Sequence, residues 1–292
     1  MDVRLIAVPY HLGRPRISAG LGPEALLAAG ADAAVREVGC TATIDLLDVS
    51  AASTNEIAAA FEVSRALASR VRDAVAHGAF PLILAGNCNS SAGTLAGLAT
   101  DGLGAVWFDA HTDFNTPERT TTGLLEGMAL AIATGHAWPA MARALPGFRP
   151  IAGNQVVLVG ARDLDAEEQR RLDDLGAVVV GPDRVHAAGI EPVLHESFEQ
   201  MPAGTRQMYL HLDLDVLDPS EGKPHDWALP NGLSLDETVQ AIQLLGDRFA
   251  LRAASIAGYD PACDLDGRVA RAAIRILGAQ ANSARSSLAA AN

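Results

Sequence analysis

Short apolar runs recur along the chain, and longer segments with a helical spacing of apolar residues lie between them. Apolar runs in which polar residues do not alternate are typical of parallel strands covered on both faces. Eight runs are predicted as buried strands, namely residues 5–8, 44–47, 81–84, 105–108, 156–159, 177–180, 208–214 and 254–257. The pattern predicts helices at residues 55–77 and 165–175, and Ser234 with Glu237 forms a capping box that opens another helix.

Strands and helices alternate from one end of the chain to the other, which indicates an α/β fold with a mostly parallel sheet. The chain has 292 residues, of which 49% are hydrophobic, and this is enough to bury one large core. No internal repeat, low-complexity linker or change of composition divides it. We therefore expect residues 1–292 to form a single domain.

Charge and cysteine content narrow the functional classes. The formal net charge is −13 and there is no basic run, which disfavours nucleic-acid binding. No apolar run reaches the roughly 18 residues that span a membrane, and the N-terminal run lacks the apolar region of a signal peptide. The three cysteines, Cys40, Cys88 and Cys263, form an odd and sparse set that argues against a disulfide framework. We therefore expect a cytoplasmic protein that does not act at a membrane.

Two acidic clusters follow apolar strands. Asp109, His111 and Asp113 alternate after one predicted strand, and Asp213 and Asp215 alternate at the end of another. This alternation predicts that the side chains within each cluster point the same way. Ligands of such sheets bind at the carboxyl ends of the strands, so both clusters are expected at one edge. Either cluster alone is also consistent with a loop cap or turn, but their joint occurrence favours a metal site.

Carboxylates crowded in this way repel one another, and some take up protons unless cations compensate. Two divalent ions would compensate, and oxygen-rich donors with an imidazole suit manganese. Two metals a few ångströms apart also activate a shared water as a nucleophile. The remaining histidines have no such context and are predicted to be surface or satisfied core residues: His11, His77, His136, His186, His195, His211 and His225.

The residues around both clusters resemble the signatures of the arginase and agmatinase (ureohydrolase) family. Residues 109–117 look like the first signature, residues 211–219 resemble the second, and residues 9–30 are similar to the family's N-terminal segment. The resemblance covers nearly the whole chain. It implies a three-layer α/β/α sandwich around a mostly parallel eight-stranded sheet, two divalent metal ions with Mn²⁺ as the expected ion, and a homo-oligomer that is a trimer or a hexamer.

The resemblance also implies a role for each ligand. Asp109 and Asp213 would bridge both metals, Asp113 would bind the first metal, and His111 and Asp215 would bind the second. The family's remaining ligand is a histidine, and Cys88 stands in its place. A thiolate is a softer ligand than imidazole and shifts the site toward zinc or iron. The alternative is a buried inert thiol in a site that has lost one metal.

Two further departures concern proton transfer and the substrate. Glu126 stands where the family has a histidine that is thought to shuttle protons. A carboxylate can do this if burial raises its pKa, and the alternative is a solvated loop glutamate. Gly258 stands where arginases place the glutamate that grips the guanidinium group. Either Glu126 or Asp260 replaces that glutamate, or the head group of the substrate is altered.

Residues that resemble the substrate-binding residues of arginases are partly kept. Asn115 and Thr122 are kept or conservatively replaced, whereas Leu124 replaces an asparagine that contacts the substrate carboxylate. Residues 160–168 resemble the loop that binds the α-amino group, where Asp165 is the expected contact and Glu168 supports it. Asp165 is equally suited to cap the following helix. If it binds substrate, the substrate is an α-amino acid.

The resemblance therefore implies a metal-dependent amidinohydrolase whose partner is a small guanidino substrate. The expected reaction cleaves the guanidino C–N bond of L-arginine or Nω-hydroxy-L-arginine to give ornithine plus urea or hydroxyurea. Asp113 is expected to accept a proton and pass it toward the leaving amine, with Glu126 as a second catalytic group. Two other interpretations remain. One is a hydrolase of another guanidino acid or amide, and the other is a catalytically inactive homologue that binds metal, which the changes at Cys88 and Gly258 motivate.

Overall fold

The computed structural model describes residues 1–49, 53–164 and 166–290. Within this part of the chain, eight strands form one sheet in the order β4-β1-β5-β10-β9-β6-β7-β8, and all its pairings are parallel. The strands are β1 (Asp2–Val8), β4 (Thr41–Leu46), β5 (Phe80–Ala85), β6 (Gly104–Phe108), β7 (Val156–Val159), β8 (Val178–Val180), β9 (Gln207–Asp213) and β10 (Ala250–Ala257). A separate antiparallel pair consists of β2 (Tyr10–His11) and β3 (Arg14–Pro15).

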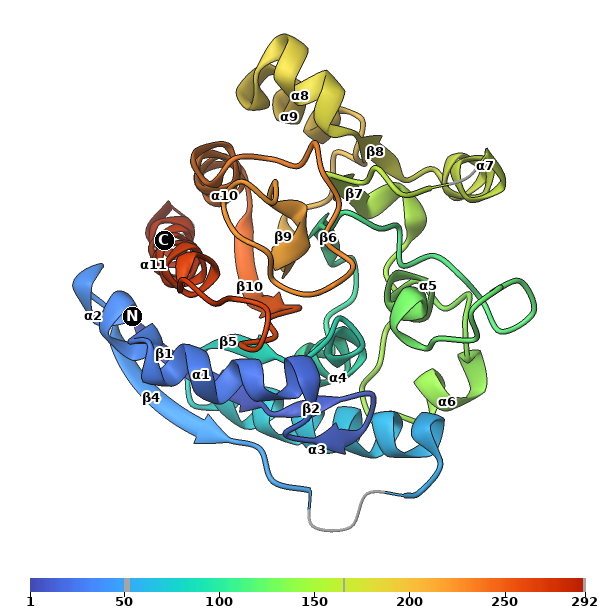
Figure 1. Cartoon of the computed structure of the whole chain (residues 1–292). Coiled ribbons are helices and arrows are strands. Elements are labelled where there is room, and N and C mark those ends of the chain that lie inside the picture. Colours follow the sequence, from blue (N-terminus) through green and yellow to red (C-terminus); the bar gives the residue numbers. More distant parts are fainter. Residues whose placement is uncertain (50–52, 165, 291–292) are drawn as a thin grey trace.

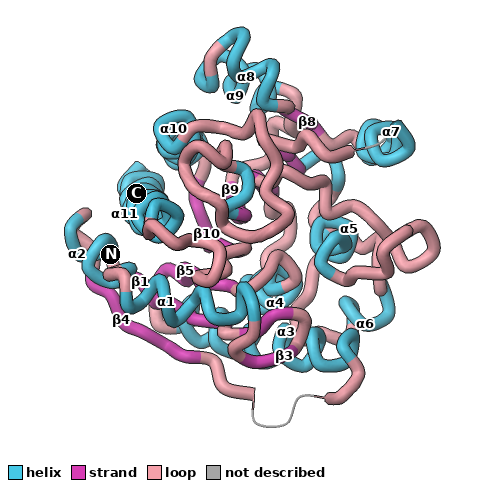
Figure 2. The backbone as a smooth tube through the Cα atoms, in the orientation of Figure 1, coloured by secondary structure: helices cyan, strands magenta, loops and turns pink. Residues whose placement is uncertain are grey.

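Helices cover both faces of the sheet (Figures 1 and 2). One face carries α1 (Gly22–Ala28), α2 (Ala31–Glu37), α8 (Pro182–Ala188), α9 (Ile190–Glu199), α10 (Leu235–Arg248) and α11 (Arg268–Ala290). The other face carries α3 (Glu56–Ala76), α4 (Ser90–Leu98), α5 (Ala129–Ala133), α6 (Pro139–Arg143) and α7 (Ala166–Leu175). Short 3-10 turns are η1 (Ser18–Leu21), η2 (Glu126–Met128), η3 (Gly153–Gln155) and η4 (Leu214–Val216). The predicted α/β/α sandwich is confirmed.

Alternating strand residues build a hydrophobic core on each face. In β5, Leu82 and Leu84 belong to the core beneath α1, α2 and α11, whereas Ile83 packs into the core beneath α3 and α4. All three side chains are fully buried. Because a strand sends successive side chains to opposite faces, a strand covered by helices on both sides has to be apolar at every position. This explains why the strands appear in the sequence as unbroken apolar runs.

The eight predicted strands coincide with the eight strands of the sheet. The run at 156–159 matches β7 at both ends, and the largest shift is at β10, which begins at Ala250 rather than at residue 254. The prediction that the strand at residues 44–47 is buried was wrong for two of its side chains. Ile44 and Leu46 of β4 are 51% and 41% exposed, because β4 is an edge strand that pairs only with β1.

The helix predictions are confirmed where the structure describes them. α3 begins after Asn55, whose side chain accepts a hydrogen bond from the backbone N–H of Ala58. The capping box that opens α10 is present, with reciprocal hydrogen bonds between Ser234 and Glu237. α7 begins at Ala166. The predicted capping role of Asp165 lies outside the described residues.

Cysteine state and helix hydropathy bear on the remaining general predictions. All three cysteines are free, with Cys40 and Cys88 buried. Across the described ranges, no helix combines the length and the apolar composition required to cross a bilayer. The cytoplasmic location stays a prediction.

The order of the central strands decides where the polar loops meet. β5, β10, β9 and β6 are neighbours in the sheet and run parallel, so their carboxyl ends lie side by side. The loops that leave these ends carry Cys88, Asp109, Asp213 and Gly258. A binding site at this edge is the arrangement expected for an α/β sheet.

Candidate active site and metal centre

One cavity of about 330 Å³ opens at the carboxyl ends of the central strands. All six predicted metal ligands line it: Cys88, Asp109, His111, Asp113, Asp213 and Asp215. The cysteine follows β5, the next three residues follow β6, and the last two lie at the end of β9. The fold therefore brings together residues that are up to 127 positions apart in the sequence, as the two acidic clusters predicted.

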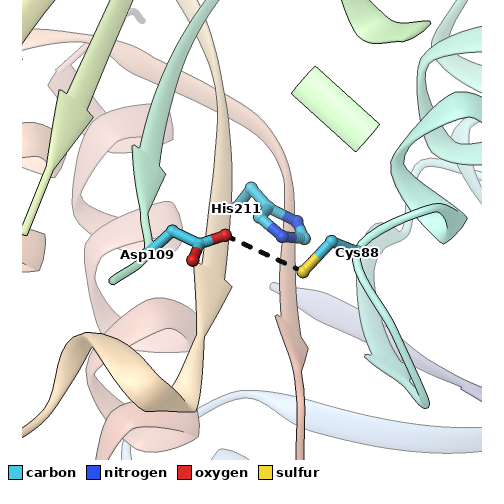
Figure 3. A group of neighbouring side chains, drawn as sticks. All are labelled: Cys88, Asp109 and His211. Atoms are coloured by element: carbon cyan, nitrogen blue, oxygen red, sulfur yellow. Dashed lines mark hydrogen bonds between the residues drawn. The ribbon is translucent and has the colours of Figure 1, made fainter. Parts of the chain in front are cut away.

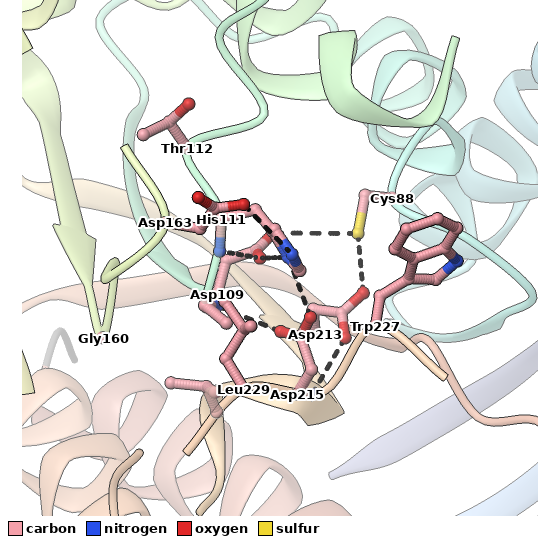
Figure 4. Close-up of polar contacts among 12 residues, drawn as sticks. Cys88, Asp109, His111, Thr112, Gly160, Asp163, Asp213, Asp215, Trp227 and Leu229 are labelled. Carbon is pink, nitrogen blue, oxygen red and sulfur yellow. Dashed lines mark hydrogen bonds and ion pairs between the residues drawn. The ribbon is translucent and has the colours of Figure 1, made fainter. Parts of the chain in front are cut away.

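The imidazole of His111 lies between two carboxylates. Its Nδ1 atom is 2.9 Å from Asp215 Oδ2 and 3.5 Å from Asp109 Oδ1 (Figure 4). Backbone hydrogen bonds fix both acids, since Ala110 N–H donates to Asp215 Oδ1 and His111 N–H donates to Asp109 Oδ1. These three side chains offer one donor atom each within 4.8 Å of one another. Such spacing suits a single cation.

The thiol of Cys88 lies beside the carboxylates of Asp213 and Asp109. Cys88 Sγ lies 3.0 Å from Asp213 Oδ2 and 4.0 Å from Asp109 Oδ2. Figure 3 shows Cys88 and Asp109 with His211, and the donor atoms of these three residues also lie within 4.8 Å of one another. Burial and the neighbouring carboxylates raise the pKa of Cys88, so the thiol keeps its proton and donates to Asp213 unless a cation is bound.

The local backbone differs from the predicted strand-like alternation. β6 ends at Phe108, so Asp109, His111 and Asp113 lie on a loop, and Asp113 has a positive φ of 50°. Asp215 lies in the 3-10 turn η4 rather than on a strand. The expected alternation does not continue as extended strand through either cluster, although the side chains of both clusters do line one cavity. A loop and a turn, not strand periodicity, aim them inward.

Among the described residues of the cavity, imidazoles are the only side chains that can carry a positive charge beside this cluster. Among the described residues that line the cavity there is no lysine or arginine. Burial, together with the charges of Asp215 and Asp213, raises the pKa of Asp109 to about 7. Burial and the charge of Asp109 raise the pKa of Asp113 well above its usual range, and Asp113 Oδ2 is buried with no hydrogen-bond partner among the described residues. A buried set of carboxylate, imidazole and thiol donors with an unpaired oxygen fits divalent cations.

The other predicted site residues also line this cavity where they are described. They are Asn115, Thr122, Glu126 and Glu168. Glu168 Oε1 accepts hydrogen bonds from Thr112 Oγ1 at 2.8 Å and from Asn115 Nδ2 at 3.3 Å. Asp165 and its predicted contact lie outside the described residues.

Glu126 lines the cavity beside His11. Its carboxylate lies 3.9 Å from His11 Nε2, and its side chain is 31% exposed. Burial, with the negative charge of Asp213 as the next cause, raises the pKa of Glu126 to about 7. A group with this pKa can both accept and release protons near neutral pH.

Two histidines were misassigned from the sequence. His11 and His225 line the cavity and are neither ordinary surface residues nor satisfied core residues. His225 Nε2 lies 3.6 Å from Asp213 Oδ1 and 3.4 Å from Asp215 Oδ2. Its Nδ1 accepts the backbone N–H of Trp227 at 3.2 Å, which places the proton of a neutral ring on Nε2, facing the carboxylates. In the sequence, the only signal was its place in the loop that follows Asp215.

His211 matches its predicted core location only in part. It is fully buried in β9, its ring lies 3.8 Å from that of Trp107, and its Nδ1 is 2.8 Å from Ser255 Oγ. Its Nε2 is buried and has no hydrogen-bond partner in the described part of the chain. Burial lowers the pKa of His211 to about 3, so the ring is neutral.

Gly258 comes so close to the carboxylate of Asp213 that it leaves no room for a side chain. A Cβ atom at this position would lie 2.3 Å from Asp213 Oδ1, and the residue has a φ of +77°. Asp260 does line the cavity, where it accepts a hydrogen bond from Ser18 Oγ at 2.9 Å. The backbone of Gly258 therefore occupies the space beside Asp213, so the glutamate could not be restored there without moving that carboxylate.

Comparisons with known proteins agree with this geometry. The model of the "Arginase family" matches residues 1–281. The chain is 30% identical over 290 residues to an arginase of Bacillus caldovelox, covering 94% of this chain and 96% of that one. It is 29% identical to an arginase of Bacillus subtilis (strain 168), with the same coverage. The crystal structure of arginase from Bacillus subtilis superimposes with a TM-score of 0.86 at 28% identity, covering 96% of this chain and 98% of that chain.

A structure at lower identity shares the fold alone. Proclavaminate amidino hydrolase from Streptomyces clavuligerus is 20% identical, with a TM-score of 0.75 over 98% of this chain and 92% of that chain. The match of the family model over nearly the whole chain goes further than shared architecture. The chain belongs to the arginase family, whose members are metal-dependent hydrolases of C–N bonds in linear amidines.

Proposed function

We propose that this protein hydrolyses the guanidino C–N bond of an arginine-like α-amino acid. L-arginine would give ornithine and urea, and Nω-hydroxy-L-arginine would give ornithine and hydroxyurea. The observation that carries the proposal is the shared cavity, in which the carboxylate cluster, Glu126 and the Asn115–Glu168 pair face one space. A cavity that holds metal ligands, a group with a pKa near neutrality and polar anchors has the parts that such a hydrolase needs.

The metal ligands we propose are the six donors of the cavity. Asp109 and Asp213 would bridge two ions, because each lies next to donors on both sides of the cluster. Cys88 and Asp113 would complete one ion, and His111 and Asp215 the other. Manganese is the proposed ion on the oxygen-rich side of the site.

The two ions would supply Lewis-acid activation of the attacking water. Asp113, with its unpaired Oδ2, accepts a proton from this water as the water oxygen bonds to the guanidino carbon. Asp113 would then pass this proton toward the leaving nitrogen as the C–N bond breaks, with Glu126 on the cavity wall as the second group that relays it. Burial raises the pKa of Glu126 to about 7, so this side chain can hold and release a proton near neutral pH.

The amino-acid end of the substrate is assigned to the rim that contains Asn115, Thr122 and Glu168. Glu168 already accepts two hydrogen bonds there, so its carboxylate is held in a fixed position. Asp165 is proposed as a further contact to the α-amino group. A hydroxylated guanidino group, which is less strongly cationic, suits a cavity in which Gly258 replaces the glutamate that arginases place there.

A substrate panel tests this proposal. Manganese-loaded protein is incubated with L-arginine, Nω-hydroxy-L-arginine, agmatine and 4-guanidinobutyrate, and release of urea or hydroxyurea is measured. We expect turnover of the two α-amino acids above that of the other two. Asp113→Asn is the inactive reference, and Asp101→Asn, whose side chain is 88% exposed, is the matched control. No turnover of any compound favours a metal-binding homologue without activity, and faster turnover of agmatine contradicts the α-amino assignment.

We also propose that the protein is a homo-oligomer, a trimer or a hexamer. The exposed apolar side chains of Ile44 and Leu46 on the edge strand β4 are consistent with association. Light scattering after gel filtration should give three or six times the chain mass of 30.3 kDa. A mass of one chain at micromolar concentration rules this out.

A further inference from the structure

The indole of Trp227 is exposed at the wall of the catalytic cavity. The residue is 64% exposed, whereas Trp107 is fully buried and Trp138 is half-buried. Trp227 lines the same cavity as Cys88, Asp213 and His225, and Figure 4 shows its side chain among the residues of the metal cluster. A large aromatic side chain left open in a binding cavity offers a face that a ligand can cover.

A tight turn holds this tryptophan in place. The backbone N–H of Trp227 donates to His225 Nδ1 at 3.2 Å, and the N–H of Ala228 donates to the carbonyl oxygen of His225 at 3.4 Å. The other ring nitrogen of His225 lies 3.4 Å from Asp215 Oδ2. The imidazole of His225 therefore connects this turn to the metal cluster, and Trp227 lies two residues after it in the sequence.

Position 258, beside Asp213, has no room for a carboxylate that would grip a cation. A side chain at Gly258 would collide with Asp213, and Asp260 is engaged by Ser18. A planar guanidino group can instead be held by an aromatic face, through contact with the negative face of the ring. An indole is the strongest such partner among the aromatic side chains. The acidic lining of the cavity favours entry of a cationic or polar amidine.

We propose that Trp227 is a specificity-determining residue whose indole face stacks on the planar guanidino or hydroxyguanidino group of the substrate. This inference rests on the proposed function, since it names how that substrate is held. The stacking predicts that the site distinguishes substrates by the shape of their head group. L-arginine and Nω-hydroxy-L-arginine carry a flat, delocalised head group, whereas L-lysine carries a compact ammonium group that cannot stack.

Tryptophan fluorescence tests the inference without relying on turnover. Manganese-loaded protein carrying Glu126→Gln, which keeps all six proposed metal ligands and is expected to turn over slowly, is titrated with L-arginine, Nω-hydroxy-L-arginine and L-lysine. We expect the two guanidino compounds to change the emission of the exposed Trp227, and L-lysine to leave it unchanged. Trp227→Leu should remove the change and raise the dissociation constant, measured by calorimetry, by roughly 3- to 30-fold. Trp227→Phe should recover part of the affinity.

The controls separate the possible failures. Leu265→Ala removes another apolar side chain, 94% exposed and outside the cavity, and should leave affinity unchanged. If the parent protein binds guanidino compounds but Trp227→Leu binds them equally well, the role of Trp227 is wrong and the proposed function stands. If the parent binds none of them, both are wrong. If acrylamide fails to quench Trp227 in the free protein, the indole is covered by another copy of the chain, and the inference is overturned.

Discussion

At the scale of single residues, Cys88 is the change with the clearest chemical consequence. Its sulfur lies 3.0 Å from Asp213 Oδ2 and 4.0 Å from Asp109 Oδ2, so it shares the cluster with the two acids proposed to bridge the metals. A bound cation would displace the proton of the thiol and make it a ligand. A thiolate gives the site a softer donor than the imidazole that the family places there.

Replacing Cys88 with histidine should shift the preference of the site toward manganese. The physical reason is that imidazole is a harder ligand than thiolate, so zinc and iron lose their advantage. The variant is expressed in medium with equal manganese and zinc, and the metal content of the purified protein is measured by mass spectrometry. We expect a higher ratio of manganese to zinc in Cys88→His than in the parent, with unchanged circular dichroism.

Cys88→Ala provides the comparison for that experiment. It removes the donor without adding another, so it should lower the metal content. If metal content and activity are the same in Cys88→Ala and in the parent, the thiol is not a ligand and its correspondence with the family histidine is mistaken.

Glu126 is the second residue whose chemistry can be isolated. Glu126→Gln keeps the size of the side chain but cannot transfer a proton, so turnover should fall by roughly 10²-fold or more. A proton-transfer role lowers mainly kcat, whereas an anchor used equally in the ground and transition states raises mainly KM. Steady-state kinetics on L-arginine and Nω-hydroxy-L-arginine distinguish them. Glu118→Gln, an exposed carboxylate of the same loop region, is the matched control, and a Glu126→Gln variant as active as this control contradicts both roles.

At the scale of elements, the end of β10 constrains the metal site through its backbone. Gly258→Ala places a Cβ atom 2.3 Å from Asp213 Oδ1, so either the carboxylate or the loop has to move. We expect the variant to lose metal, because Asp213 is proposed to bridge both ions. The measurement is metal content after dialysis against a metal-buffered solution.

A matched glycine separates this clash from backbone strain. Gly78 has a φ of +74°, close to the +77° of Gly258, but a Cβ atom there would meet nothing within 4 Å. Gly78→Ala should therefore cost stability through the strained φ alone and keep the full metal content. Equal metal content in the two alanine variants would show that Asp213 tolerates the contact.

The elements that the sequence predicted well are those whose periodicity has one physical cause. Strands buried on both faces have to be apolar throughout, so the run at 156–159 could be assigned to its last residue. β4 was predicted as buried because an apolar run does not reveal that its strand lies at the edge. The acidic clusters were found because carboxylates rarely follow two apolar strands by chance, but their loop and turn geometry has no periodicity to detect.

The residues that the sequence did not reveal lie on irregular loops. His225 and Trp227 reach the cavity from a turn between η4 and α10, and no spacing rule connects this turn to the clusters. His11 reaches it from the short pair β2 and β3. Their position depends on how the loops fold back over the sheet, which is set by tertiary packing and not by local pattern.

At the scale of the whole molecule, charge balance links the metal site to stability. The chain carries a net charge of −13, and the described residues lining the cavity include no lysine or arginine. The acids Asp109, Asp113, Asp213 and Asp215 are buried at the carboxyl ends of the central strands. Without cations, their mutual repulsion and desolvation act at the centre of the sheet, where they oppose folding.

Removing metal should therefore lower the Tm of the protein, and restoring it should raise the Tm again. A ligand at 100 times its dissociation constant stabilises the folded state by about 2.7 kcal/mol per site. For a chain of this size, we expect a rise of roughly 5 °C or more on adding Mn²⁺ to dialysed protein, since each kcal/mol shifts Tm by about 2–4 °C in domains of somewhat smaller size. Scanning calorimetry at fixed protein concentration measures this change in Tm.

Asp213→Ala, which lacks a proposed bridging ligand, should show little of this rise. A Tm that is the same with chelator and with Mn²⁺ would mean that the buried carboxylates are stabilised by protons and not by cations.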